Sequence, residues 1–415
     1  MDPAADQVLS PWASPLASAG MGGPNARVLS HESVRSAMIP LTPDQRDLLD
    51  LCRDFGEREI RPNARRVDEA DVETPWDLWA KAAAAGITDF MLPAEYGGGG
   101  CTDVFTQCLV QEELGAADAA IGNLLTANGF FADPVLELGT KEQCERWLRP
   151  LTGPNPPMTA LAVTEPGVGS DVAAITTRAV RETGGYRLSG QKAWISNGGA
   201  AQFYVIFATL DPALRSKGVT AFLVDKGAPG LAFGSPMRKM GQRAIVNTEV
   251  FLDGVFVPDE DRLGDEGRGF HGLMRTFDIS RTVLAASAVG LARACLDLAT
   301  AYAKERTQFG KPIIEHQAVA FRLADMATKI DASRLLTWRS ARLLDAGQPA
   351  AAESAMAKLT ASETAMYCSW AAVQTLGGWG YSREFLAEKW MRDAKLEEIE
   401  EGTSDIQRLI ISRSL

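Results

Sequence analysis

The chain has 415 residues, 46% of them hydrophobic, and a formal net charge of −11 at pH 7. This length accommodates two or three domains, and the apolar content excludes disorder for most of the chain. The acidic balance argues against a nucleic-acid-binding protein, because such proteins present clustered Lys and Arg to phosphates. Six scattered cysteines without a Cys-x-x-Cys pair, with only three histidines, favour neither a metal site nor a disulfide framework. We therefore expect no bound metal and reduced thiols.

The N-terminal residues and the lengths of the apolar runs indicate where in the cell the protein is expected. No apolar run approaches the ~20 residues that span a bilayer, and the N-terminus lacks the charged and apolar regions of a secretory signal. We therefore expect a cytoplasmic protein without a membrane partner. Residues 1–38 are rich in Ala, Ser, Pro and Gly without periodicity. They are expected to form a flexible N-terminal tail, or to reflect an over-long gene start with Met38 as the alternative beginning.

Three segments of different texture follow this tail. Residues 39–157 have helical periodicity and predict an N-terminal helical domain. Between residues 158 and 266, short β-branched and aromatic runs are separated by Gly, Asn and Asp, and Gly184-Gly185 marks a hairpin. This pattern predicts an antiparallel β domain. From residue 267 to 415, long Ala-rich helical segments with short connections predict a bundle of close-packed helices.

Two segments of the expected β domain point to ligand contacts. Residues 161–171 resemble a strand that runs into a glycine-rich turn, where backbone N–H groups can approach a phosphate or a flat ring. An ordinary hairpin turn is the alternative. Trp194 and Ser196 lie two positions apart, so that in a strand both face the same side. They can cover a cofactor ring and bond its edge, whereas a tryptophan in the core is the alternative.

Charged residues near both ends of the first long bundle helix are further candidates. Asp278 and Arg281 are three residues apart on one helix face, where a surface ion pair is the alternative. Arg306 ends that helix in a basic, glycine-bearing loop and suits a pyrophosphate, although compensation of the helix end is the alternative.

The acidic run 397–401 is the candidate for acid–base chemistry. A helix is expected to end at Gly402, and the Ser-x-x-Gln pattern from Ser404 to Gln407 predicts a capping box for the next helix. Glu401 then lies at a helix C-terminus, where the dipole raises the proton affinity of a carboxylate and suits it to general-base catalysis. A solvated helix face is the alternative for such a run.

Taken together, these segments resemble the acyl-CoA dehydrogenase family over essentially the whole chain after Met38. The resemblance rests on six motifs in order: Pro93 to Gly98, Thr164-Glu-Pro-Gly-Val-Gly-Ser-Asp171, Lys192-Ala-Trp-Ile-Ser-Asn-Gly-Gly199, Arg306-Thr-Gln-Phe-Gly310, Gln374-Thr-Leu-Gly-Gly378, and Met391-Arg-Asp-Ala-Lys395 leading to Glu401-Gly-Thr-Ser404. It implies a mixed α and β fold. The expected order is an N-terminal all-α domain, a central antiparallel β-barrel domain and a C-terminal four-helix-bundle domain.

The resemblance also implies FAD as the cofactor. The positions that match FAD contacts are Val163, Thr164, Gly169, Ser170, Trp194, Ser196, Arg306, Gln308, Phe309, Gln317, Gln374, Gly377, Gly378, Thr403 and Asp405. Those around Arg306 resemble residues that reach the FAD of a neighbouring subunit, which implies at least a dimer. Because the family is commonly tetrameric, the resemblance implies a homotetramer. The positions that match thioester-carrier contacts are Ser170, Asp278, Arg281 and Gly402.

Glu401 matches the catalytic base of the medium- and short-chain branches. Other branches carry that glutamate at the position held here by Ser280, which cannot act as the base. The implied reaction converts an acyl-CoA to a trans-2-enoyl-CoA, with Glu401 removing the α proton and hydride passing to flavin N5. The Glu401 backbone N–H and a ribityl hydroxyl would bond the thioester carbonyl. An electron-transferring flavoprotein is the expected electron acceptor.

Other functions remain open on the same fold. One is a biosynthetic dehydrogenase acting on a carrier-protein-bound acyl group, and another is an oxygen-using flavin oxidase or monooxygenase. Glu400 stands where relatives often have an aromatic residue. It either points to solvent, which we favour slightly, or lines the acyl pocket and favours a polar or cationic acyl group. The stretch from Ile121 to Phe131 offers no Arg for a dicarboxylate, which argues against a glutaryl-type substrate.

Overall fold

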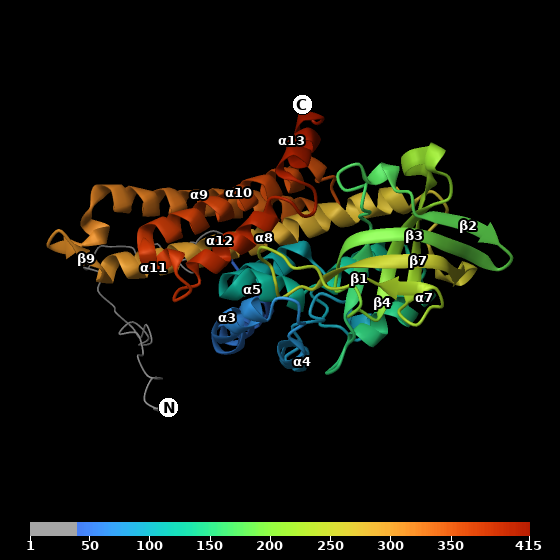
Figure 1. Cartoon of the computed structure of the whole chain (residues 1–415), viewed down its shortest axis with the longest axis horizontal. Coiled ribbons are helices and arrows are strands. Elements are labelled where there is room, and N and C mark those ends of the chain that lie inside the picture. Colours follow the sequence, from blue (N-terminus) through green and yellow to red (C-terminus); the bar gives the residue numbers. More distant parts are fainter. Residues whose placement is uncertain (1–39) are drawn as a thin grey trace, which may run out of the picture. The chain divides into compact units, whose positions relative to one another are not determined.

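The computed structural model describes residues 40–415 (Figure 1), so the predicted tail at 1–38 lies outside the described residues. Contacts divide the chain into a unit that ends at Arg46 and a second unit, residues 47–415. Apart from the start of helix α2, the following description applies to the second unit. The helix α2 (Pro43–Phe55) begins at a capping box. Thr42 N donates to Gln45 Oε1 at 3.0 Å and Gln45 N donates to Thr42 Oγ1 at 3.2 Å, which fixes where this helix starts.

The N-terminal region is helical, as predicted. Its elements after α2 are η1 (Gly56–Ile60), α3 (Arg61–Ala70), α4 (Trp76–Ala84), η2 (Ala94–Tyr96), α5 (Val104–Leu125), α6 (Gly129–Leu138), α7 (Lys141–Leu148) and η3 (Arg149–Leu151). The helix α5 is kinked, because Asp118 inside it has an extended backbone (φ −168°, ψ 118°). The Asp118 carboxylate accepts from Ile121 N at 3.2 Å, so the side chain caps the second half of the kinked helix.

The central region is a β domain. Its strands are β1 (Thr159–Ala162), β2 (Arg178–Glu182), β3 (Gly185–Ser196), β4 (Phe203–Thr209), β5 (Val219–Asp225), β6 (Leu231–Phe233), β7 (Asn247–Pro258) and β8 (Arg262–Leu263), with the short helices η4 (Val172–Ala174), η5 (Pro212–Gly218) and η6 (Asp259–Asp261) between them. The sheet order is β6-β7-β3-β2-β4-β5-β8, and β1 pairs with β4. The predicted hairpin is present, since β2 and β3 pair around Gly184. Most pairs are antiparallel, but β1 and β2 run parallel to β4, which alternation in the sequence does not reveal.

The C-terminal region returns to helices. Its elements are α8 (Gly269–Glu305), β9 (Thr307–Gln308), β10 (Lys311–Pro312), η7 (Ile313–Glu315), α9 (Gln317–Asp345), α10 (Ala351–Leu376), α11 (Gly378–Tyr381), α12 (Ala387–Glu397) and α13 (Ser404–Ser412). The long helix α8 packs against α9, α10 and α12, and also against α5 of the N-terminal region (Figure 1). The core between these helices is rich in alanine, which allows close helix approach.

The expectation that no apolar run approaches the length that spans a bilayer is wrong for helix α8. Among the described residues it is the one helix that is long and apolar enough to cross a membrane, with a mean hydropathy of 1.5 over 18 residues. However, 78% of that window is buried inside the protein. The apolar composition of α8 is therefore that of a core helix, because its neighbours already cover it on several sides.

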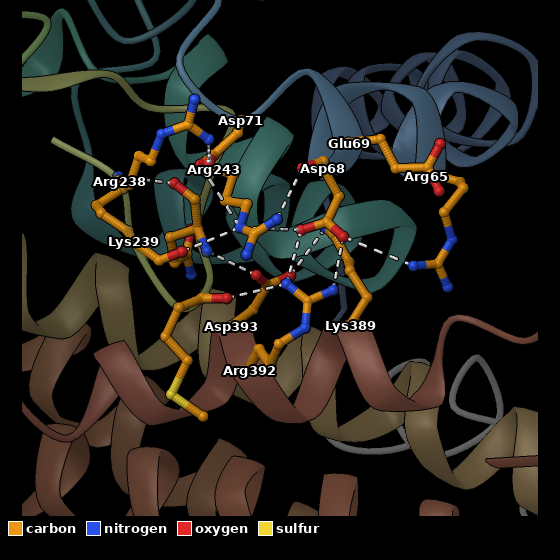
Figure 2. A network of polar contacts seen from close by, with 12 residues as sticks. Arg65, Asp68, Glu69, Asp71, Arg238, Lys239, Arg243, Lys389, Arg392 and Asp393 are labelled. Carbon is orange, nitrogen blue, oxygen red and sulfur yellow. Dashed lines mark hydrogen bonds and ion pairs between the residues drawn. The ribbon is translucent and has the colours of Figure 1, made fainter. Parts of the chain in front are cut away.

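A network of charged residues ties α12 to both other regions (Figure 2). Arg392 contacts Asp68 in the last turn of α3, with Nη2 and Oδ2 2.6 Å apart. Asp393 accepts from the Gln242 backbone N–H at 2.6 Å, which comes from the segment between β6 and β7. Lys389 lies 2.8 Å from Asp393 and also pairs with Asp118. Since these groups are largely buried and mutually paired, they fix the direction of α12, which leads into the acidic run.

Candidate active site

One large cavity collects residues from all three regions. Its volume is about 1410 Å³, and it is lined by the glycine-rich segment 163–173, by Trp194 and Ser196 of β3, and by residues 399–403. A pocket for one drug-sized ligand occupies about 300–1,000 Å³. The cavity therefore has room for two ligands that meet in it, as a cofactor and its substrate must.

Glu401 lies on a tight turn in the wall of this cavity. The helix α12 ends at Glu397 and α13 begins at Ser404, and between them Glu401 has φ +53° and Gly402 has φ +96°. A left-handed conformation costs a non-glycine residue about 1–3 kcal/mol and persists only where the surroundings impose it. The strain at Glu401 is thus maintained by contacts around the turn.

Side chains from three helices supply those contacts. Arg281 of α8 donates from Nε to Glu401 O at 2.9 Å. Gln407 of α13 donates from Nε2 to the carbonyls of Glu401 at 3.1 Å and Gly402 at 2.8 Å. Lys358 of α10 donates from Nζ to Gly402 O at 2.9 Å. Both carbonyls of the turn are therefore held from outside it.

The predicted capping box of α13 is wrong. Thr403 is the N-cap, because its Oγ1 accepts from Ile406 N at 3.3 Å, one residue earlier than expected. Gln407 consequently falls outside the capping position and bonds the carbonyls of the preceding turn instead. The Ser404 hydroxyl is buried and has no hydrogen-bond partner among the described residues.

The Glu401 carboxyl is held by a side chain of α8. Ser280 Oγ donates to Glu401 Oε2 at 2.7 Å. Burial raises the pKa of Glu401, while the Ser280 hydrogen bond and the charges of Arg281 and Lys358 lower it. Burial, not only the helix end that the sequence suggested, thus raises its proton affinity. Burial and the nearby Glu401 also raise the pKa of Asp133, on the same cavity wall, to about 7.

The acidic run is not a solvated helix face. Glu397 is 1% exposed and its Oε1 accepts from Gln242 Nε2 at 3.0 Å. Glu400 lines the cavity, so the expectation that it points to solvent is wrong. Its Oε1 is buried without a hydrogen-bond partner in the part of the chain that the structure describes, and burial raises its pKa to about 7. Glu398 does not line the cavity itself, but it pairs at 2.6 Å with Lys395, which does.

The β-domain wall of the cavity presents a flat ring and open turns. Trp194 is 59% exposed, which rules out the core-anchor alternative. It has φ +62° and lies where the β3–β7 register shifts between Lys192 and Ile195. Ser196 Oγ accepts from Asn247 Nδ2 at 3.2 Å, so its own proton is available to a ligand. No atom lies within 4 Å of a Cβ built on Gly167 or Gly169. An exposed indole, a hydroxyl donor and an open glycine turn fit the flavin ring of FAD.

A buried lysine supports this wall from behind. Lys192 Nζ donates to Val163 O and to Glu165 Oε1, both at 2.9 Å, and the backbone N–H of Ala193 donates to Thr164 O at 2.9 Å. These bonds occupy the carbonyls of residues 163 and 164. Any cofactor contact of Val163 and Thr164 must therefore use their other groups. Gly169 and Ser170 are exposed on the same wall.

The remaining predicted cofactor residues lie elsewhere in the chain. Arg306, Gln308, Gly377 and Gly378 line a second cavity of about 580 Å³, near the β9–β10 hairpin and α11, at the end of the bundle away from strands β2 and β3 (Figure 1). Phe309 at the hairpin tip is 93% exposed. Three further exposed residues line neither cavity: Gln317, Gln374 and Asp405. The chain thus does not bring the two sets together, whereas Thr403 belongs to the first.

The predicted thioester contacts divide in a similar way. Ser170, Arg281 and Gly402 line the large cavity, but Asp278 does not. Asp278 lies 3.5 Å from Arg281 and accepts from Ser354 Oγ at 3.4 Å. Arg281 is only 5% exposed, which excludes a surface ion pair. Asp278 therefore contacts a cavity-lining residue, Arg281, without lining the cavity itself.

Sequence reasoning missed several residues of the site. Lys358 and Gln407 support the turn by hydrogen bonds, and the charge of Glu401 raises the pKa of Asp133. Lys358 carried one usable signal, since it is a single lysine within a run of alanines and other small residues on a helix that must be buried. Asp133, next to Pro134, carried no signal in periodicity.

The three parts of the chain match three family models in the same order. These are "Acyl-CoA dehydrogenase, N-terminal domain" over residues 42–153, "middle domain" over 160–255 and "C-terminal domain" over 267–415. The cyclohex-1-ene-1-carbonyl-CoA dehydrogenase of Geobacter metallireducens is 45% identical, and the match covers 91% of this chain and 99% of that protein. The human mitochondrial short-chain specific acyl-CoA dehydrogenase is 40% identical, over 93% of this chain and 92% of its own length. The solved butyryl-CoA dehydrogenase of Megasphaera elsdenii is 37% identical with a TM-score of 0.87, covering 91% of this chain and 99% of that one.

The chain therefore belongs to the acyl-CoA dehydrogenase family. It is an FAD-dependent oxidoreductase that dehydrogenates an acyl-CoA. The fold class predicted from the sequence is confirmed. The comparisons do not favour the carrier-protein alternative.

Proposed function

We propose that Glu401 is the catalytic base and takes the α proton of the acyl-CoA. The observation that supports this most directly is its carboxyl, held by Ser280 on the wall of the cavity that also contains Trp194. Burial raises its pKa, which brings its basicity closer to that required near neutral pH. The neighbouring Glu400 is the only other carboxyl of the acidic run in that wall among the described residues.

The turn around Glu401 would also stabilise the charge that develops on the thioester. A thioester α proton is weakly acidic, so the enolate oxygen needs hydrogen-bond donors in place before the proton leaves. The Glu401 backbone N–H is the proposed donor, and one donor of this kind contributes about 3–4 kcal/mol. Arg281, Lys358 and Gln407 hold the turn carbonyls, so the donor is fixed in advance.

FAD would be held by two sets of residues. In the large cavity these are Val163, Thr164, Gly169, Ser170, Trp194, Ser196 and Thr403. The second set consists of Arg306, Gln308, Phe309, Gln317, Gln374, Gly377 and Gly378. Asp405, on α13 two residues after Thr403, is proposed as a further contact outside both sets. When bound, the flavin supplies the two-electron acceptor for the β hydrogen. Ser170, Arg281 and Gly402, with Asp278 behind Arg281, would hold the thioester carrier.

We propose that a second copy of the chain completes the cofactor site. The second set lies exposed around the β9–β10 hairpin and away from the large cavity, as expected if it contacts the FAD of a neighbour. At least a dimer follows, and a homotetramer is our proposal. An electron-transferring flavoprotein as electron acceptor, a cytoplasmic location and domain limits at 39–157, 158–266 and 267–415 also remain proposals.

The proposed acyl group is short, either a linear chain or a six-membered ring. The cavity wall formed by α5 and the following turn is polar: Gln111 Nε2 donates to Asn123 Oδ1 at 2.7 Å, and Thr126 Oγ1 donates to Gln111 Oε1 at 2.9 Å. Extra methylenes placed against these groups would gain little by burial. The names of the two curated relatives above, one short-chain specific and one acting on a cyclohexene carbonyl-CoA, support the same class.

Anaerobic bleaching of the bound flavin tests both the base and the acyl class. Purified holoenzyme is titrated with butyryl-CoA, octanoyl-CoA and the saturated cyclohexane-1-carbonyl-CoA, each of which carries an α and a β hydrogen, and the flavin absorbance is followed in time. We expect rapid bleaching by a short or cyclic thioester, and a rate about 10²–10⁴-fold lower in Glu401→Gln. Glu398→Gln is the matched control, because it removes a charge from the same run at a residue that does not itself line the cavity; its partner Lys395 does and keeps its charge. Wild-type bleaching rates in Glu401→Gln would overturn the assignment of the base.

A further inference from the structure

Lys358 lies under the catalytic turn in an unusual setting for a lysine. It is 1% exposed and emerges from α10 among alanines and serines. Its ammonium donates to the Gly402 backbone carbonyl at 2.9 Å. Burying an ammonium is costly unless opposite charge or hydrogen bonds compensate it. The compensation for Lys358 therefore has to come from around the turn.

The other fully buried lysines of the described chain are compensated differently. Lys192 contacts the carboxylate of Glu165 at 2.9 Å, and Lys389 contacts that of Asp393 at 2.8 Å. The hydrogen bond of Lys358, in contrast, goes to a backbone carbonyl. Burial lowers the pKa of Lys358, whereas the charges of Glu400, Glu397 and Glu401, in decreasing order of effect, raise it. A cation shared by three carboxyls influences which of them is ionised.

We propose that Lys358 is a positioning residue that holds the Gly402 carbonyl next to Glu401 and, through its charge, favours the ionised form of Glu401 before each proton abstraction. This inference rests on the proposed role of Glu401 as the base. It assigns to α10 a part in catalysis although none of its residues lines the large cavity. Lys358 itself touches neither substrate nor cofactor in this arrangement, and it acts through the turn.

The charges that face Glu401 come from several elements. Arg281 and the Ser280 hydroxyl come from α8, Lys358 comes from α10 and Asp133 comes from α6. Two more acids stand beside Lys358, namely Glu397 at the end of α12 and Glu400 on the turn, and Lys239 also faces Glu400. Removing Lys358 leaves Arg281 as the remaining cation acting on Glu401. The pKa of Glu401 must then rise, because a cation stabilises its ionised form.

The test is the pH dependence of flavin bleaching in Lys358→Met, Lys358→Arg and the wild type, as anaerobic holoenzymes. The acidic limb of the pH–rate profile is the range in which the bleaching rate rises with pH as the base loses its proton. In Lys358→Met we expect this limb to move to higher pH by about one unit, so that the rate at pH values below the limb falls about tenfold and recovers at high pH. Lys358→Arg keeps the charge and is expected to keep the wild-type limb. Lys81→Met is the control, because Lys81 is half exposed on α4 and pairs with Glu59.

The outcomes separate this inference from the proposed function. A rate that falls equally at every pH in Lys358→Met, or a limb that does not move, overturns the charge role of Lys358. Wild-type rates in Glu401→Gln overturn the base itself, whatever Lys358 does. Gly402 O also accepts from Gln407, so the turn keeps one of its bonds in the variants. If Lys358→Met does not retain flavin, Lys358→Gln gives the same comparison with a polar side chain that can still reach the carbonyl.

Discussion

The two regions that carry the predicted ligand contacts differ in how the chain supports them. Around Glu401, side chains from α8, α10 and α13 bond the turn, and the carboxyl itself is held by Ser280. Around the β9–β10 hairpin, Phe309 is 93% exposed and Tyr381 of α11 is 84% exposed. In the first region, the hydrogen bonds that hold the turn all come from the same chain. The second presents its contacts outward, as expected if another copy uses them.

The same backbone conformation occurs in both regions and makes the difference clearer. Glu401 and Phe309 both have φ +53°. At Glu401 three side chains hold the strained turn. At Phe309 the support is the short β9–β10 pairing, with a contact of 3.1 Å between His316 Nε2 and Gln308 O. Strain held by a dense network suits a residue that must act at a fixed point.

Among changes that leave every charge of the catalytic turn in place, the largest loss of rate is expected at Gly402. Gly402 has φ +96°, and a Cβ there would lie 2.8 Å from Gln407 Nε2. Gly402→Ala should therefore displace Glu401 and lower the anaerobic bleaching rate about 100-fold, since such losses accompany misplacement by about 1 Å. Gly153→Ala is the control, because Gly153 has φ +92° but no atom within 4 Å of the added Cβ. Equal rates in both variants would show that the support of the turn is dispensable.

The buried pair behind the flavin wall is expected to matter for stability. Burial opposes ionisation of Glu165, but Lys192 and the hydrogen bonds from Thr177 and Thr176 lower its pKa to about 2, from an ordinary value of 4.5. A carboxyl with a depressed folded-state pKa stabilises the fold above its unfolded pKa. That stabilisation is lost as the pH falls from about 4.5 towards 2. Glu165→Gln should lower the free energy of unfolding by about 3–5 kcal/mol at pH 7, because Lys192 is left buried without its partner.

Urea unfolding at pH 7.5 and pH 3.5 measures this. The difference between wild type and Glu165→Gln should shrink at the lower pH. Glu182→Gln breaks an exposed pair with Arg187 and is expected to leave the free energy of unfolding almost unchanged, because solvent screens such a pair. A Glu165→Gln variant as stable as Glu182→Gln would mean that the pair does not stabilise this wall.

If the residues around the β9–β10 hairpin contact the FAD of another copy, flavin binding should depend on association of the copies. Arg306→Gln should weaken FAD retention about tenfold, which is the effect of losing one charge-assisted hydrogen bond. The bleaching rate of the flavin that stays bound should not change. Flavin content after gel filtration at two protein concentrations measures this, and wild-type retention should fall when dilution separates the copies. The control is Arg66→Gln, since Arg66 is exposed on α3 and lines neither cavity. Retention unaffected by dilution to monomers would contradict a shared site.

The smallest expected effect concerns the hydroxyl of Ser280. Its hydrogen bond lowers the pKa of Glu401, so Ser280→Ala should raise that pKa. The acidic limb of the bleaching rate then moves to higher pH, and the rate below the limb falls about threefold. Ser287→Ala on the same helix is the control, because Ser287 is buried but does not line the cavity. An unmoved limb would mean that Ser280 only fills space beside the base.

The sequence predicted what depends on local pattern. The order of helical, β and helical regions follows from periodicity, and the hairpin around Gly184 follows from its glycines. The motif around Glu401 identified the candidate base because residue types in order carry the family resemblance. Trp194 and Ser196 alternate with the buried Ile195, as a strand requires.

The remaining features depend on contacts between distant segments. The capping box was misplaced by one residue because Thr403 and Ser404 are both good caps, and the bonds of Gln407 to the turn decide between them. Glu400 was expected in solvent because the run looks like a polar helix face, whereas the chain turns it into the cavity. Lys358 lies over 40 positions from Gly402 in sequence. No spacing rule connects two such positions.

The most direct test of Glu401 as the base separates proton removal from hydride transfer. A 3-thiaacyl-CoA, with sulfur in place of the β carbon, has no β hydrogen to lose, so exchange of its α hydrogens with solvent D₂O reports proton abstraction alone. We predict rapid anaerobic exchange of 3-thiabutyryl-CoA by the wild type and Glu398→Gln, and exchange at least about 100-fold slower in Glu401→Gln. Exchange at the wild-type rate in a flavin-loaded Glu401→Gln would contradict the account, because another group would then be removing the α proton.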